Sequence, residues 1–322
     1  MTVPAPEFRV RPATMDDLDA VLALVVAHDI AEFGHPDFSL ENLRGEWEDL
    51  DLAEDSFLAV APDGQVVGYA TVRHRRNYVQ IDSDGYVHPD HWGLGVGALL
   101  VRVTEERARR LAPLAPEGIK VVLTNAVSGA NRPARALLEQ EGYQATRHFW
   151  RMVIDLEGPP APVSWPEGIT VRPCASEADE RSVFLATDEA FRDHWGYVPE
   201  TYDEWRPRQK DASDTGLWFL VEEDGEPTAA AVCTYFMDMG WVRRIGVRRP
   251  WRRRGLGEAL LRHAFGEFYR RGTTRIGLGV DASNPTGATR LYEKAGMRVV
   301  HEYALYQKVL RPGRDPGPEP EE

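Results

Sequence analysis

The sequence of 322 residues contains only two cysteines, Cys174 and Cys233, and they form no CxxC pair. A disulfide framework and a cysteine-based metal site are therefore excluded. Cys233 lies within the apolar run AAAVCTYF, where we expect a small buried hydrophobic side chain rather than a nucleophile. The segment HPDH at 88–91 contains a proline, so we expect a turn there and no bound metal.

Positive charge is scarce as well. The chain has 38 Lys and Arg against 51 Asp and Glu, a net charge of −13. This balance argues against nucleic acid and anionic membranes as partners, because both are polyanions. No apolar run approaches the length of about 20 residues that spans a membrane. The N-terminal MTVPAPEFRVRP lacks the apolar core of a signal peptide, so we expect a cytoplasmic protein.

The chain is longer than one typical domain, and its sequence repeats itself. Three segments of the first half match three of the second in the same order: FRVRPATMDDLDAVLAL with ITVRPCASEADERSVFL, VHPDHWGLGVGALL with VRRPWRRRGLGEAL, and ARALLEQEGY with ATRLYEKAGM. They predict a duplicated domain. We expect domains at 1–156 and 168–310, a proline-rich linker at 157–167 and a disordered tail at 311–322.

Strand-like and helix-like patterns alternate in each half. We expect strands at SFLAVA, VVGYATV, YVQIDSDGYV and KVVLTNAV, and in the second half at LWFLVEE, TAAAVCTYF, GWVRRIGV and RIGLGV. The segment NPTGATRLYEKAG predicts a capped helix that begins near Asn284 and stops at Gly296. The mixture predicts an α/β fold, of the α+β type with a mixed sheet, in each half.

Five arginines are concentrated in RRPWRRRGLGEALL at 248–261, between a strand ending at Val247 and an amphipathic helix. A helix N-terminus has unpaired N–H groups and a partial positive charge. Glycines such as Gly255 and Gly257 let the backbone close on a ligand. This segment therefore predicts a site for a compact polyphosphate. The pattern GxxxxGK[ST] is excluded because no Lys-Ser or Lys-Thr follows Gly257. The pattern GxGxxG is excluded because its third glycine is missing.

The spacing of Arg252, Gly255 and Gly257 fits [QR]-x-x-G-x-[GA] and resembles the pyrophosphate loop of the GCN5-related N-acetyltransferase (GNAT) superfamily. The strand end at Val247, ASN at 282–284 and ATRLYEKAGM at 288–297 add to this resemblance, which covers nearly the whole chain as two copies. The tandem arrangement and FRDHWG at 191–196 resemble most the mycothiol-synthase-like branch.

The resemblance implies two tandem acyl-CoA N-acyltransferase domains that use acetyl-CoA as co-substrate and acetylate a primary amine of a small molecule. It implies CoA contacts in the second half at Ile245, Gly246, Val247, Arg252, Arg253, Arg254, Gly255, Leu256, Gly257, Glu258 and Asn284. The matching first-half residues, Val87, Gly93, Gly95, Val96 and Gly97, imply a second CoA site.

The two copies differ where the chemistry is expected. The family's acid tyrosine falls on Tyr292 in the second half and on Leu138 in the first, and Trp92 replaces Arg252. Leucine cannot donate a proton to a departing thiolate. We therefore expect catalysis in the second half, with a degenerate first copy that binds CoA or shapes the acceptor cleft.

The general base is not identified by these patterns. The mycothiol-synthase-like branch has a glutamate where this chain has Trp241, which puts mycothiol synthesis itself in doubt. Asp238 and Glu204 are alternative carboxylates, and His194 is a base, a substrate contact or a structural histidine. In the first half, Asp82 and Asp84 attract a cationic acceptor or are simply solvated.

Two other functions fit the same residues. One is a non-catalytic module that binds CoA or a metabolite, although Tyr292 and Arg252 argue against it. The other is a protein N-terminal acetyltransferase, which needs an open peptide groove. A monomer is expected, because two fused copies can replace the dimer contacts of single-domain relatives.

Overall fold

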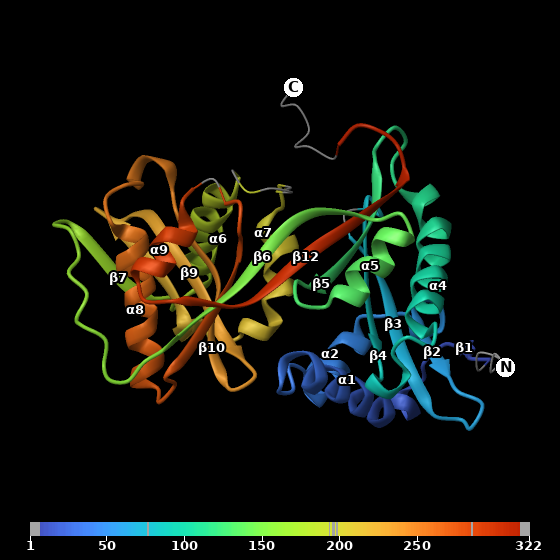
Figure 1. The fold of residues 1–322 in the computed structure, drawn as a ribbon. Coiled ribbons are helices and arrows are strands. Elements are labelled where there is room, and N and C mark those ends of the chain that lie inside the picture. The colour runs from blue at the N-terminus through green and yellow to red at the C-terminus, as the bar shows by residue number, and fades with distance from the viewer. Residues whose placement is uncertain are drawn as a thin grey trace. The chain divides into compact units, whose positions relative to one another are not determined.

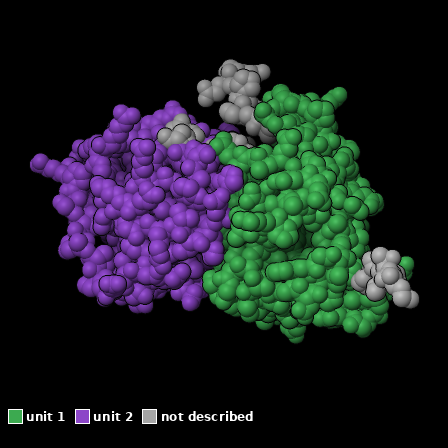
Figure 2. Space-filling model, in the orientation of Figure 1, with its two compact units in different colours: residues 1–147, 303–316 green, residues 148–302, 317–322 purple. Residues whose placement is uncertain are grey.

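The computed structural model describes residues 7–75, 77–192, 194, 197, 199–284 and 286–315, without the side chains of residues 210 and 211. The chain forms two compact units (Figure 2). Unit 1 comprises residues 1–147 and 303–316, and unit 2 comprises residues 148–302 and 317–322. Each unit has a mixed sheet with helices packed on it, as the alternating pattern predicts (Figure 1).

The sheet of unit 1 has the strand order β1-β2-β3-β4-β5-β12. Neighbouring strands are antiparallel except for the parallel pair β4 and β5. The strands are β1 Arg9–Arg11, β2 Ser56–Val60, β3 Val66–Arg75, β4 Gln80–Val87, β5 Val121–Ser128 and β12 Arg298–Arg311. The helices are α1 Leu18–Phe33, α2 Leu40–Glu48, α3 Leu52–Asp55, α4 Val96–Leu111 and α5 Arg132–Gln140.

The sheet of unit 2 repeats this plan with the order β6-β11-β10-β9-β8-β7, and β10 and β11 are its parallel pair. The strands are β6 Gln144–Asp155, β7 Ile169–Pro173, β8 Trp218–Glu223, β9 Glu226–Phe236, β10 Met239–Val247 and β11 Arg275–Asp281. The helices are α6 Glu177–Phe191, α7 Tyr202–Trp205, α8 Leu256–Arg270 and α9 Ala288–Lys294. The eight strand-like segments of the sequence all form strands.

Residues of β8, β9 and β10 alternate between two apolar cores, because successive side chains of a strand point to opposite faces. On one face, Cys233 and Val242 pack against α8 and α9. On the other face, Val232 and Trp218 pack against α6 and α7. Cys233 is fully buried, as predicted, and burial raises the pKa of its thiol. The sheet of unit 2 thus separates a face covered by α8 and α9 from a face covered by α6 and α7.

The last strand of each sheet comes from the other half of the sequence. In unit 1, β12 pairs with β5 from Tyr303↔Ser128 to Arg311↔Val121. In unit 2, β6 pairs with β11 from Phe149↔Asp281 to Asp155↔Arg275. The sequence repeats predict limits at 1–156 and 168–310, whereas the compact units change over inside β6 and β12.

The predicted linker and the first residues of the expected tail both contact the compact units. In the linker 157–167, Trp165 packs on the core of unit 2 with its ring 6.0 Å from that of His263. In the expected tail, the Arg311 guanidinium donates to the carbonyls of Ala112, Ala115 and Ile119. The backbone of Arg314 pairs with residues 118–120. The expectation of disorder is therefore wrong for residues 311–315, and residues 316–322 lie outside the described part of the chain.

The segment HPDH forms the predicted turn, with Pro89–His91 in a 3-10 helix. Among the described residues, no group of three or more histidine, cysteine or acidic side chains is arranged to hold a metal ion. Within that same part of the chain, every helix is too short or too polar to cross a bilayer.

Candidate functional site

The parallel strands β10 and β11 separate partway along their length. Their pairing runs from Gly240↔Ile276 to Val242↔Leu278, and beyond this point β10 continues to Val247 without β11 as a neighbour. A β-bulge between Val242 and Arg244 marks the place where they part. The open edge of β10, from Arg243 to Val247, is about 16 Å long at 3.3 Å per residue. We call this open edge the slot of unit 2, since β11 does not pair with β10 along it.

The glycine-rich loop lies at the open end of this slot. Helix α8 begins at Leu256, with Gly255 as its N-cap in a left-handed conformation at φ +82°. The first intrahelical bond runs from the N–H of Ala259 to the carbonyl of Gly255, so the amides of 256–258 have no acceptor within the helix. No side chain caps them. Amides in this position at a helix N-terminus have the local geometry that binds anions.

Three arginines of the loop are held by the protein. Arg248 pairs with Glu189 at 2.7 Å and with Glu226 at 3.1 Å. The Arg252 Nε donates to the carbonyl of Val247 at 3.1 Å, and its guanidinium also reaches the carbonyl of Ala190. Arg252 thus ties the loop to the end of β10 and to α6.

Arg254 is held in the same manner. Its guanidinium binds both oxygens of Glu223, at 2.5 and 3.0 Å, and Trp251 Nε1 donates to the same carboxylate at 2.7 Å. The hydrogen bonds from Arg254 and Trp251 lower the pKa of Glu223 to about 2. Glu223 therefore stays ionised and fixes the outer side of the loop.

Arg253 differs from these arginines. Its backbone has φ +64°, a left-handed conformation that costs a non-glycine residue about 1–2 kcal/mol. Its side chain is exposed and makes no ion pair or hydrogen bond with any described residue. Beside the free amides of α8, the loop therefore presents a cation that has no partner in the described part of the chain.

Other glycines near the loop serve packing. A Cβ on Gly257 would lie 3.1 Å from Leu291 Cδ1, so this glycine lets α8 approach α9 rather than facing a ligand. A Cβ on Gly246 would lie 2.5 Å from the Cβ of Ala190 in α6. Gly257 was expected to make room for a phosphate, but its surroundings indicate a role in helix packing.

The remaining predicted CoA residues lie in β10, in α8 or shortly before α9. Leu256 is buried, and Ile245 and Val247 pack against the same core. The Glu258 carboxylate pairs with Arg262 and Lys294, which leaves only its amide for a ligand. Asn284 accepts hydrogen bonds from the amide and hydroxyl of Thr286.

The helix after Asn284 begins later than predicted. Its first residue is Ala288, and its N-cap is Gly287 at φ +77°. The Asn284 side chain closes a local turn at Thr286 instead of capping the helix. In unit 1, Asn131 directly caps α5 by accepting from the N–H of Ala134 at 3.0 Å.

Helix α9 places Tyr292 in the apolar core that includes Ile245 and Val247. The residue is 8 % exposed, and burial raises the pKa of its phenol to about 12. The hydroxyl has no hydrogen-bond partner among the described residues. It is also absent from the buried, unpartnered polar atoms of that part of the chain, so solvent reaches it. A neutral phenol with a free donor therefore lies on the α8 and α9 face of the sheet.

The predicted base candidates do not gather at the slot. Asp238 lies in the exposed turn between β9 and β10, nine residues before Val247 and about 30 Å from it along the strand. Glu204 accepts from the amide and hydroxyl of Thr201 in a helix cap, which lowers its pKa. Trp241 stacks near Phe236, with 5.4 Å between the ring centroids.

His194 follows α6, on the other face of the sheet from Tyr292. Its ring stacks on Phe191 with 4.2 Å between centroids. The guanidinium of Arg244, the residue after the bulge, lies 4.7 Å above the same Phe191 ring. The Arg244 NH1 is 3.6 Å from Glu200 Oε1. Sequence reasoning missed Arg244 and Glu200, because no local pattern joins residues 44 positions apart.

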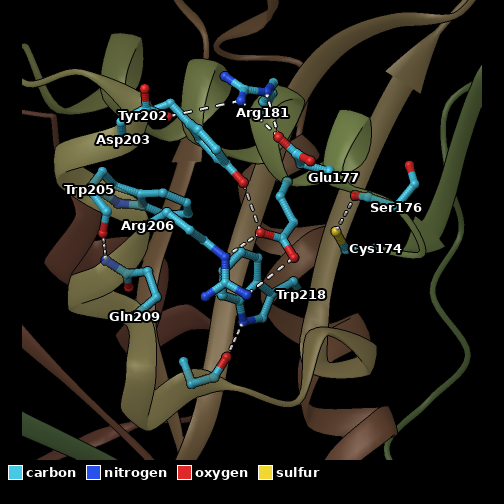
Figure 3. Close-up of polar contacts among 12 residues, drawn as sticks. Cys174, Ser176, Glu177, Arg181, Tyr202, Asp203, Trp205, Arg206, Gln209 and Trp218 are labelled. Atoms are coloured by element: carbon cyan, nitrogen blue, oxygen red, sulfur yellow. Dashed lines mark hydrogen bonds and ion pairs between the residues drawn. The ribbon is translucent and has the colours of Figure 1, made fainter.

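Helix α7 and the 3-10 helix Arg206–Ala212 are fixed to the rest of unit 2 by a polar network (Figure 3). The Arg206 guanidinium pairs with Glu180 and lies 5.2 Å from the ring of Trp218. Tyr202 donates to the same Glu180 at 2.9 Å, and Gln209 donates to the carbonyl of Trp205. These contacts hold the segment after Glu200 against α6 and β8.

Unit 1 repeats the slot and the loop. The pairing of β4 and β5 stops at Asp82↔Thr124, and Gly93 and Gly95 have φ +76° and +90°. Trp92 Nε1 donates to the carbonyl of Val87 at 2.9 Å, as Arg252 does to Val247. The guanidinium and the indole therefore perform the same structural task in the two copies.

Two other predicted residues of unit 1 support this loop. Val96 is buried at the start of α4. A Cβ on Gly97 would lie 3.1 Å from Leu137 Cδ2, the same packing role that Gly257 has in unit 2.

A hydrogen-bonded chain spans the slot of unit 1. His28 Nδ1 contacts the carbonyl of Val87 at 3.1 Å, and its Nε2 pairs with Glu32 at 2.8 Å. Glu32 in turn accepts from Asn131 Nδ2 at 3.1 Å, just beyond β5. Leu138, which replaces the tyrosine, is buried. Unit 1 thus has the loop but no tyrosine at the position that matches Tyr292.

The acidic residues of β4 have protein partners nearby. Asp82 accepts from Gln80 at 3.0 Å and lies 3.4 Å from Arg75. Asp84 lies opposite Thr71 of β3, and the charge of Arg73 acts on it.

The model of the acetyltransferase (GNAT) family matches residues 24–143 and 180–297, well over half of the chain. A mycothiol acetyltransferase from Thermomonospora curvata is 30% identical over 76% of this chain and 80% of its own. A mycothiol acetyltransferase from Nocardiopsis dassonvillei is 28% identical over 96% and 98%.

A solved GCN5-related N-acetyltransferase from Sphaerobacter thermophilus is 40% identical and covers 96% of this chain and 97% of its own, with a TM-score of 0.87. A tandem GNAT protein from the clavulanic acid biosynthesis pathway, 16% identical, has the same fold with a TM-score of 0.72 over 96% of this chain and 100% of its own. The chain therefore belongs to the acetyltransferase (GNAT) family as a tandem, mycothiol-synthase-like member, and it is an acetyl-CoA-dependent N-acetyltransferase.

Proposed function

We propose that unit 2 transfers the acetyl group of acetyl-CoA to a primary amine of a small molecule, and that each chain has one catalytic site. The observation that carries this proposal is Tyr292, a buried phenol with a free hydroxyl, where unit 1 has Leu138. The free amides of α8 and the cation of Arg253 support binding of the CoA diphosphate. The slot beside β10 accommodates the extended arm that leads to the thioester.

The reaction needs one nucleophile and one leaving group. The amine nitrogen attacks the thioester carbon, so a C–N bond forms while the C–S bond breaks and CoA leaves as a thiolate. Tyr292 stabilises the developing sulfur charge by donating a hydrogen bond. Because its pKa is about 12 and that of a thiol is about 8.5, complete proton transfer to the sulfur would be unfavourable. Hydrogen-bond donation is the role that the phenol's pKa supports.

The proton of the amine goes to water in this proposal. Trp241 offers no proton acceptor, Asp238 lies at the far end of β10, and Glu204 is used in a helix cap. The attacking amine must then be neutral before it reacts. We expect kcat/KM to rise with pH up to the pKa of the acceptor amine and to level off above it.

The test compares Tyr292→Phe with Tyr143→Phe, which removes a buried phenol hydroxyl from unit 1. Release of free CoA from acetyl-CoA is measured with a panel of small amines, and acetyl-CoA binding is measured by calorimetry. We expect Tyr292→Phe to bind acetyl-CoA normally and to lose about 10²-fold or more in kcat. The control should keep its activity. Full activity of Tyr292→Phe would refute the assignment.

Peptides with free N-termini form the second arm of this panel. A rate that is higher for peptides than for every small amine would indicate a protein N-terminal acetyltransferase instead. Acetyl-CoA binding without turnover of any amine would indicate a binding module.

A further inference from the structure

The residue that follows the bulge of β10 is a largely buried cation with few partners. The side chain of Arg244 is 18% exposed, and burial lowers the pKa of its guanidinium. Its contacts within the described part of the chain are the ring of Phe191 and one oxygen of Glu200 at 3.6 Å. A guanidinium carries five N–H donors, and none of those of Arg244 makes a hydrogen bond to a residue that the structure describes.

Glu200 does not neutralise this site by itself, because it also pairs with Arg208. The nearby carboxylate of Asp188 accepts from the Tyr197 hydroxyl at 2.8 Å and lies 3.5 Å from Arg192. The positive charges of Arg243 and Arg208 act on Arg244 as well. Among the described residues, the one carboxylate that Arg244 contacts is therefore shared with a second arginine. A buried charge is costly unless it is paired, so this arrangement favours an anionic ligand.

The fold itself does not require a cation at this position. Counting back from the matched strand ends Val247 and Val87, the residue of unit 1 that corresponds to Arg244 is Asp84. The same strand in the same fold thus carries a carboxylate in one copy and a guanidinium in the other. The charge of Arg244 is a property of unit 2 alone.

Arg244 and Tyr292 lie on opposite faces of the sheet of unit 2. Arg244 lies opposite Val232 on the α6 and α7 face, whereas Tyr292 belongs to the α8 and α9 face. The phosphates of CoA belong at the loop after Val247, about 10 Å further along the strand. The arm between diphosphate and thioester has amides and hydroxyls but no charge. The anion that Arg244 attracts must therefore come with the second substrate.

We infer that Arg244 binds a carboxylate of the acceptor, so that the amine substrate is an amino acid or a small amino-acid conjugate with a free carboxylate. This inference rests on the proposed function of unit 2. The planar guanidinium matches a carboxylate with two parallel hydrogen bonds. The Phe191 ring below it and the fixed segment after Glu200 hold the guanidinium in place.

The test uses pairs of acceptors that differ only in the carboxylate. Wild-type protein is assayed by CoA release with a panel of amino acids and dipeptides and with their α-amides. Amides have the more nucleophilic amine near neutral pH, so intrinsic reactivity favours them. We nevertheless expect at least one carboxylate acceptor to exceed its amide by about 10- to 100-fold in kcat/KM.

Variants then test whether Arg244 causes this preference for carboxylate acceptors. Arg244→Gln should reduce the ratio of carboxylate to amide to one or below, and Arg244→Lys should retain part of it. Arg270→Gln, which changes an exposed arginine at the end of α8 on the other face of the sheet, should leave the ratio unchanged. Calorimetry with acetyl-CoA shows that each variant is folded and binds the donor. Amino phosphonates form a further arm, and a preference for them over carboxylates would overturn the inference.

Two failures are distinguishable. If wild-type protein acetylates uncharged amines as well as carboxylate acceptors, or if Arg244→Gln keeps the preference, the inference is wrong and the proposed function stands. If wild-type protein binds acetyl-CoA but acetylates no amine of either kind, the proposed function fails and the inference fails with it.

Discussion

Replacing Arg253 with glycine should separate affinity for acetyl-CoA from stability. Arg253 has φ +64°, and unit 1 has Gly93 at the matching position with φ +76°. Relief of the left-handed strain, about 1–2 kcal/mol, is largely offset by the backbone entropy of glycine, about 0.5–1 kcal/mol. Arg253→Gly should therefore leave the free energy of unfolding unchanged or raise it by up to about 1.5 kcal/mol.

The same substitution should weaken acetyl-CoA binding. A charge-assisted contact to phosphate contributes about 1.5 kcal/mol, which corresponds to about tenfold in Kd. The side chain is exposed, so the effect should shrink as salt is added. Calorimetry with acetyl-CoA at low and high salt measures both quantities, and urea denaturation measures stability.

Arg254→Gln is the matched control. Because Glu223 already binds both sides of the Arg254 guanidinium, we expect a smaller change in Kd than for Arg253→Gly. An unchanged Kd of Arg253→Gly at low salt would refute the view that Arg253 is the cation that the loop offers to phosphate. A larger effect for Arg254→Gln would refute it as well.

Two further predictions concern stability. Gly257→Val should lower the free energy of unfolding, measured by urea denaturation, by about 1–3 kcal/mol, because its Cβ would lie 3.1 Å from Leu291 Cδ1. The control Gly266→Ala, in the same helix, should not destabilise the protein. Burial alone would lower the pKa of His28, but the hydrogen bonds to Glu32 and to the carbonyl of Val87 outweigh it, so the pKa is raised. Burial alone would raise the pKa of Glu32, but the interaction with His28 outweighs it, so the pKa is lowered. The pair's contribution is thus fully present between about pH 4.5 and 6.5 and is lost as pH rises through the raised pKa of His28 or falls through the lowered pKa of Glu32. Thermal unfolding of Glu32→Gln across pH should show a weaker pH dependence than wild type, and an identical profile would count against this pair.

The loop was predictable because its signal is local. Glycine at positions that adopt positive φ, a preceding strand and a following amphipathic helix are all visible within twenty residues of sequence. Gly255 and Gly95 both have left-handed conformations, as such a turn requires. Tyr292 could be singled out for the same reason, since its helix pattern is continuous in sequence.

The functions of individual arginines were not predictable in this way. Arg252 faces the backbone carbonyls of Val247 and Ala190, and Arg254 faces Glu223 on a different strand. Charge composition cannot indicate which cations have partners far away in sequence. Asp238 was misleading because it is close to β10 in sequence but lies in a turn at the end opposite the loop.

The exchange of β6 and β12 was also invisible to sequence reasoning. Both strands pair with neighbours in antiparallel register, so the residue pattern of either is compatible with either sheet. Repeats show which segments correspond, but they do not show which sheet each segment joins.

The exchanged strand makes the completion of unit 1 depend on the order of protein synthesis. Strand β5 is translated roughly 180 residues before its partner in β12, because Ser128 pairs with Tyr303 and Val121 with Arg311. At 5–20 residues per second, the ribosome needs about 10–35 s to reach that partner. During this interval the edge of β5 offers unpaired N–H and C=O groups to any other strand, including β12 of a neighbouring nascent chain. Translation speed over the second half therefore governs how long the first half is open to mispairing.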